Sequence, residues 1–182
     1  MTSDVISTKY DRTFDMLDAD GNGVLEERDF VGIAESIARA TGVAGGSAKE
    51  AMLLREWRRS WATLLEHTDA NGDGQISREE FHQAMARAYG DAALLEHNLR
   101  AGFEAEFAAI DADDDGVATV DQMAAFLVAW GLEPAQAQAA SMRLDQDGDG
   151  RITLQEYLTG WSAFLLDEDA EAVGSTLLGS LN

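Results

Sequence analysis

Four twelve-residue stretches of the sequence repeat one spacing of oxygen-bearing side chains. They read DADGNGVLEERD at 18–29, DANGDGQISREE at 69–80, DADDDGVATVDQ at 111–122 and DQDGDGRITLQE at 145–156. Each has Asp at position 1, Asp or Asn at positions 3 and 5, Gly at position 6 and an apolar residue at position 8. Carboxylates packed this closely repel one another. The repeat therefore indicates sites for a hard dication, which about six to eight oxygens would surround.

The second and fourth stretches supply every expected oxygen. In such a loop, positions 1, 3, 5 and 12 coordinate through side chains and position 7 through its carbonyl, while position 6 needs glycine because the backbone turns sharply. The expected ligands are Asp69, Asn71, Asp73, Gln75 and Glu80 in the second stretch, and Asp145, Asp147, Asp149, Arg151 and Glu156 in the fourth. We expect each stretch to bind Ca²⁺.

The first stretch departs from this pattern at its last position. Its expected ligands are Asp18, Asp20, Asn22, Val24 through its carbonyl, and Asp29. Aspartate at position 12 is one methylene shorter than glutamate, so a contact through both carboxylate oxygens is harder to reach. A single-oxygen contact suits six-coordinate Mg²⁺ better than seven-coordinate Ca²⁺. We expect a dication here, with Mg²⁺ competing.

The third stretch departs twice, with the neutral amide Gln122 at position 12 and Ala118 at position 8. Thr119 and Gln122 still form the T-x-x-Q pattern that caps the start of a helix. We expect this loop to be weak or empty as a metal site. Solvated acidic turns would account for Asp, Asn and Gly in all four stretches, but not for the apolar position 8 or the acids at position 12 in three of them.

Apolar residues recur at helical spacing on both sides of each stretch, as at Tyr10, Phe14 and Leu17. We expect an all-α fold of four helix–loop–helix units in two pairs, forming one compact globule. The expected N-terminal pair spans 1–90, with loops 18–29 and 69–80, and the C-terminal pair spans 91–182, with loops 111–122 and 145–156 and a C-terminal tail. The glycine-rich segment 41–47 is the expected linker between the second and third helices, and Pro134 is expected to open the seventh.

Charge and composition argue against several classes of partner. The 182 residues contain 34 acids and 13 bases, a formal net charge of −21, which disfavours nucleic acid and anionic membrane surfaces. The absence of cysteine excludes disulfides and thiolate metal sites. The longest apolar run, MAAFLVAW at 123–130, is too short to insert across a bilayer, and the first residues show no signal-peptide pattern. We expect a cytoplasmic monomer.

The chain resembles EF-hand proteins of the sarcoplasmic calcium-binding type, and most closely their bacterial branch. The resemblance covers nearly the whole chain and rests on the four loops, their unequal spacing, the DxDGNGxLExxD form at 18–29 and the STLLG near the end. It implies a compact globule of two paired EF-hand halves, with three working sites and one degraded. It also implies a role as a calcium buffer or signal modulator.

We expect the chain to be an intracellular Ca²⁺ buffer or transporter and not an enzyme. The alternative is a Ca²⁺ sensor that opens on binding and regulates a target protein, for which methionines such as Met142 could line a groove. Calcium-triggered photoproteins share this general fold and hold an oxidisable luciferin among His, Trp and Tyr. The three scattered histidines (His67, His82 and His97) and only three tyrosines speak against that third reading.

Overall fold

The computed structural model describes residues 4–88 and 92–166, so the C-terminal tail lies outside the described residues. The chain is almost entirely helical, which confirms the all-α class. The elements in chain order are α1 (Asp4–Leu17), β1 (Val24–Leu25), α2 (Glu27–Ala40), α3 (Ala48–Thr68), β2 (Ile76–Ser77), α4 (Arg78–Ala88), α5 (Ala92–Ile110), β3 (Val117–Thr119), α6 (Val120–Ala129), α7 (Pro134–Leu144), β4 (Arg151–Thr153) and α8 (Leu154–Leu166).

Helix starts follow local capping chemistry. Ser47 ends the 41–47 linker and caps α3 by accepting a hydrogen bond from the backbone N–H of Glu50 at 3.2 Å. Pro134 occupies the first turn of α7, as expected, because its missing N–H has no intrahelical partner to lose there. Thr119 and Gln122 form the expected capping box at the start of α6.

The apolar residues at position 8 join the loops in pairs through two short antiparallel sheets. Leu25 of β1 lies opposite Ile76 of β2, and Ala118 of β3 lies opposite Ile152 of β4; all four side chains are fully buried. The first loop is therefore tied to the second and the third to the fourth. We call α1–α4 the N-terminal pair and α5–α8 the C-terminal pair.

A run of touching aromatic rings passes from one pair to the other. Phe30 of α2 contacts Trp57 of α3, with ring centroids 5.7 Å apart, and Trp57 contacts Trp130 at the end of α6 at 5.5 Å. Trp130 then contacts Trp161 of α8 at 5.8 Å, and Trp161 stacks on Phe103 of α5 at 5.1 Å. These contacts place both pairs around one shared core.

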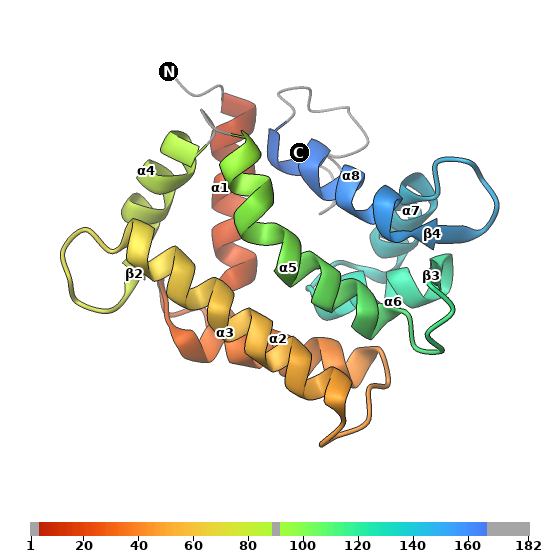
Figure 1. Cartoon of the computed structure of the whole chain (residues 1–182). Helices are drawn as coiled ribbons and strands as arrows, with labels where there is room; N and C mark the ends of the chain where they lie inside the picture. The colour runs from red at the N-terminus through yellow and green to blue at the C-terminus, as the bar shows by residue number, and fades with distance from the viewer. Residues whose placement is uncertain (1–3, 89–91, 167–182) are drawn as a thin grey trace.

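The loops lie at the periphery of this core. Figure 1 shows the loop between α3 and β2 and the loop between α7 and β4 on opposite sides of the molecule, with α5 between them. No helix in the described ranges is both long enough and apolar enough to cross a membrane.

Candidate metal centres

All four loops bend their backbone in the same way. The glycines at position 6 lie in the left-handed region, where a side chain would be strained: Gly23 (φ 88°), Gly74 (φ 81°), Gly116 (φ 88°) and Gly150 (φ 85°). These positive φ values confirm that the backbone turns at position 6 in a way that favours glycine. Position 4 is also left-handed, with glycine in three of the loops and Asp114 (φ 58°) in the third.

The aspartate at position 1 is held in the same way in every loop. One of its carboxylate oxygens accepts a hydrogen bond from the backbone N–H of the position-6 glycine. The pairs are Asp18–Gly23 at 2.9 Å, Asp69–Gly74 at 3.0 Å, Asp111–Gly116 at 2.9 Å and Asp145–Gly150 at 2.9 Å. The loops thus hold this carboxylate in place with backbone groups, which leaves its remaining lone pairs for a cation.

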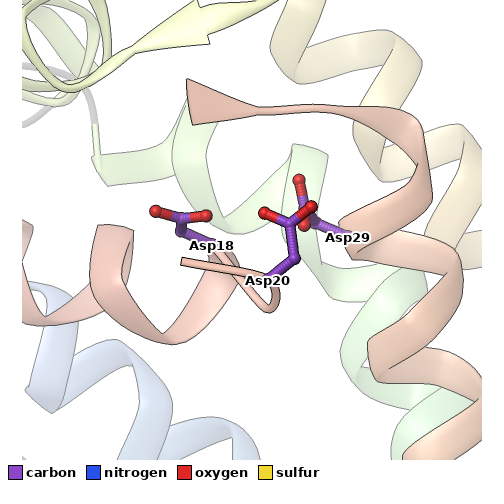
Figure 2. A group of neighbouring side chains, drawn as sticks. All are labelled: Asp18, Asp20 and Asp29. Atoms are coloured by element: carbon purple, nitrogen blue, oxygen red, sulfur yellow. The ribbon is translucent and has the colours of Figure 1, made fainter. Parts of the chain in front are cut away.

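In the first loop, three predicted ligands converge. Figure 2 shows the carboxylates of Asp18 and Asp20, from the loop, and of Asp29, from the first turn of α2, gathered around one space, and their oxygens lie within 4.8 Å of one another. Asn22 belongs to the same loop: its backbone N–H donates to Asp18 at 3.0 Å and to Asp20 at 3.1 Å.

Asp29 is the buried member of this group, with 2% of its surface exposed. Burial raises the pKa of Asp29, and the neighbouring charges of Asp20 and Asp18 raise it further, although a hydrogen bond from the Glu26 backbone N–H at 2.8 Å opposes the rise. A dication among the three carboxylates would offset the repulsion that disfavours their ionised forms.

In the second loop, Glu80 spans the loop from position 12. One oxygen accepts from the Ala70 backbone N–H at 3.1 Å and the other from the Ser77 backbone N–H at 2.9 Å. Hydrogen bonds from Ser77 lower the pKa of Glu80, so this carboxylate is kept in the ionised form that a metal requires. Asn71 and Asp73 lie on the turn between, each accepting a bond from the backbone N–H two residues on.

The fourth loop repeats this arrangement. Asp145, Asp147 and Asp149 bring their oxygens within 4.8 Å of one another. Glu156 spans the loop, accepting from the Gln146 backbone N–H at 3.0 Å and the Thr153 backbone N–H at 2.8 Å. Burial opposes ionisation of Glu156, but the bonds from Thr153 and Gln146 outweigh it and lower its pKa.

The third loop has its acids in place but lacks this spanning contact. Asp111, Asp113 and Asp115 also lie within 4.8 Å of one another. Among the described residues, Gln122 accepts a bond from the Thr119 backbone N–H at 2.7 Å and none from Ala112. Its side chain caps the helix without closing the loop, and it adds no charge at position 12.

The side chain at position 7 can reach the paired loop, while coordination through its backbone carbonyl stays a prediction. Gln75 Nε2 donates to Glu26 of the first loop at 2.9 Å, and an Arg151 guanidinium nitrogen lies 3.3 Å from Asp115 of the third. Val24 is apolar and half-buried in β1.

Glu26 occupies position 9 of the first loop, where coordination often passes through water, and it fits the loop pattern of the sequence. One residue near the loops was not predicted from the sequence. Lys49 contacts the third loop from 62 residues away in the sequence, and no local motif predicts this contact.

The donor set fits a hard dication. Every predicted ligand of the first, second and fourth loops offers an oxygen, and these loops provide carboxylates, amides and backbone carbonyls in the pattern that Ca²⁺ and Mg²⁺ favour. The two loops with Glu at position 12 can offer both of its oxygens, whereas Asp29 in the first is shorter by one methylene.

Comparisons with known proteins agree with this geometry. A family model described as an EF-hand domain pair matches residues 8–86, and one described as an EF hand matches residues 142–160. Calerythrin from Saccharopolyspora erythraea is 29% identical over 177 residues, which cover 96% of this chain and 100% of calerythrin. The alpha chain of the sarcoplasmic calcium-binding protein of Penaeus vannamei is 25% identical, covering 91% of this chain and 90% of its own.

A solved structure extends the likeness to the fold. A calcium-binding protein from Streptomyces coelicolor, described in the context of prokaryotic calcium-mediated regulation, superposes with a TM-score of 0.81 at 30% identity, covering 88% of this chain and 97% of its own. The relatives named here are calcium-binding proteins, and neither they nor the matching family models indicate an enzyme family. Since loops of this geometry and relatives of nearly full length point the same way, the chain belongs to the EF-hand family of calcium-binding proteins, beside calerythrin and the sarcoplasmic calcium-binding proteins.

Proposed function

We propose that the chain is an intracellular Ca²⁺ buffer or transporter that holds metal in its first, second and fourth loops, with the third weak or empty. The observation that carries the buffering role is the shared aromatic core. Trp57 and Trp161 are 5% and 4% exposed and belong to different pairs, yet both contact Trp130. Apolar faces packed against each other in this way are not free to receive a target helix.

The choice of loops rests on position 12. Glu80 and Glu156 each span their loop with both carboxylate oxygens, and Asp29 brings a third carboxylate to the first loop. Gln122 offers one neutral oxygen, already engaged by Thr119. A bidentate carboxylate at this position completes the Ca²⁺ shell. The third loop lacks one, so we expect its Ca²⁺ affinity to be the lowest of the four loops.

A matched set of four substitutions tests this assignment. Asp18→Asn, Asp69→Asn, Asp111→Asn and Asp145→Asn each remove one charge at position 1, where all four aspartates make the same bond to glycine. Equilibrium dialysis should find three Ca²⁺ per wild-type chain and one fewer in every variant except Asp111→Asn. Loss of a bound ion in Asp111→Asn would instead make the third loop a working site.

The alternative function is a Ca²⁺ sensor with a protein target. It is favoured by two exposed apolar side chains, Met142 of α7, which is 63% exposed, and Val128 of α6, which is 42% exposed. The Streptomyces coelicolor relative is also described in terms of calcium-mediated regulation. A sensor would enlarge this apolar surface on binding Ca²⁺, whereas a buffer would not.

A further inference from the structure

Lys49, the second residue of α3, reaches out of the N-terminal pair to the third loop. Its Nζ donates to the backbone carbonyl of Asp111 at 2.6 Å and lies 2.7 Å from Oδ1 of Asp114. The chain contains only one other lysine, Lys9. α3 packs along α5, which leads into this loop, so the contact joins the two pairs at the point where they meet.

Asp114 marks the third loop as different from the others. The equivalent position is Gly21, Gly72 or Gly148 in the other loops, all with φ between 68° and 75°, whereas Asp114 has φ 58°. Aspartate tolerates this left-handed backbone better than most residues but still less well than glycine. Aspartate at this position makes an ion pair with Lys49, a contact that glycine could not make.

A second carboxylate of the third loop also lies near a protein cation. Arg151 lies 3.3 Å from Asp115, so positive groups approach the loop from both α3 and β4. Neither contact uses position 12. The side chain at position 4 does not coordinate metal in such loops, so the ion pair between Lys49 and Asp114 does not occupy a metal ligand.

We propose that Lys49 is a positioning residue. In the absence of metal it holds the third loop in its folded conformation, and the loop thereby anchors the two pairs to each other. This deepens the proposed function, because it assigns a structural role to the loop that is weakest as a cation site. The bond to the Asp111 carbonyl carries most of the effect, since Asp111 is 6% exposed and the bond is charge-assisted. Asp114 is 74% exposed on its side chain, where an ion pair contributes little.

Amide hydrogen exchange of the whole chain, read by mass spectrometry, tests the proposal loop by loop. In a Ca²⁺ chelator, Lys49→Met should speed exchange in 111–122 by about tenfold, the loss expected for one charge-assisted bond, with no change in 145–156. Asp114→Asn should have a smaller effect, and Lys49→Arg, which keeps a charged donor, should restore protection. Arg59→Met on the same helix is the charge control, because Arg59 is exposed and pairs with Glu56.

Adding Ca²⁺ to the wild-type chain separates this proposal from the proposed function. Loops 18–29, 69–80 and 145–156 should gain protection while 111–122 changes little. If Lys49→Met behaves like Arg59→Met, or if 111–122 gains protection with Ca²⁺ as the other loops do, the anchor role is wrong while calcium binding stands. If no loop gains protection, the proposed function fails, and the chelator comparison still decides the role of Lys49.

Discussion

Glu106 is a carboxyl group enclosed in the core of the C-terminal pair. It is 3% exposed, and the hydroxyl of Tyr157 donates to its Oε2 at 2.6 Å. Burial raises the pKa of Glu106 to about 8, although the bond from Tyr157 opposes the rise. The group is therefore mostly protonated at neutral pH, which spares the core a buried negative charge.

Replacing Glu106 by Gln should stabilise the protein increasingly as pH rises. Between the ordinary value of 4.5 and about 8, the native state keeps a proton that the unfolded state releases, so stability falls as pH rises through this window. Glu106→Gln lacks this proton and keeps an acceptor for Tyr157. Its advantage in free energy of unfolding should grow by about 1–3 kcal/mol from about pH 5.5 to about pH 7.5.

Denaturant titrations at several pH values check this prediction. Glu104→Gln, two residues earlier on α5 and paired with Arg100 at 2.8 Å on the surface, is the matched control and should show no such growth. A constant difference between Glu106→Gln and wild type across the window would mean that Glu106 is ionised in the native state.

We expect Asp29 to set the metal preference of the first loop. Asp29→Glu adds the methylene needed for a two-oxygen contact, so the preference of this loop for Ca²⁺ over Mg²⁺ should rise by about tenfold. Glu80→Asp in the second loop is the reciprocal change and should shift that loop toward Mg²⁺. Calorimetric Ca²⁺ titrations with and without Mg²⁺ measure both, and unchanged Mg²⁺ competition in Asp29→Glu would refute this account of the first loop.

At the scale of the elements, each loop begins the helix that follows it. The capping box of Thr119 and Gln122 preserves the start of α6 in the one loop that lacks an acid at position 12. In the third loop the helix start is therefore kept without an acid at position 12, whereas we expect Glu80 and Glu156 both to cap their helices and to bind metal.

Gln122→Glu should convert the third loop into a metal site. Glutamate keeps the capping box and adds a charged second oxygen, so one more Ca²⁺ should bind per chain in equilibrium dialysis. Gln136→Glu, on the exposed first turn of α7, adds the same charge away from any loop and should leave the count unchanged. An unaltered count in Gln122→Glu would show that more than position 12 disables this loop.

Local spacing predicted the elements well because their causes are local. The helices around Phe14 and Trp57, the start at Pro134 and the capping at Thr119 depend on residues within a few positions of each other. The loops were predicted for the same reason, since one metal shell is drawn from twelve consecutive residues. Whether each predicted ligand binds metal stays a prediction.

At the scale of the whole molecule, the side-chain contacts between the two pairs and across the core could not be predicted. Lys49 and Asp111 are 62 residues apart, and Glu106 and Tyr157 are 51 apart. No periodicity in the sequence encodes which helix faces which across the core. A buried acid on an otherwise apolar stripe, as at Glu106, was the one visible signal, and it does not name a partner.

Calcium should stabilise the whole molecule by relieving its charge. Three bound dications would bring the net charge from −21 to −15, with the change concentrated in the loops. Saturating Ca²⁺ should therefore raise the thermal midpoint by more than about 10 °C relative to chelator. NaCl at matched ionic strength should raise the thermal midpoint much less, because it screens the charges without binding in the loops. Equal shifts in the two salts would argue against specific sites.

If the chain is a buffer, the shared core stays closed when the loops take up Ca²⁺. The most direct measurement is the fluorescence of a dye that binds exposed apolar surface, followed through a Ca²⁺ titration in millimolar Mg²⁺. We expect the dye fluorescence to fall or stay constant as the three loops bind Ca²⁺, because Trp57, Trp130 and Trp161 remain packed together. A signal that rises with Ca²⁺ would contradict it and identify the chain as a sensor that opens toward a target.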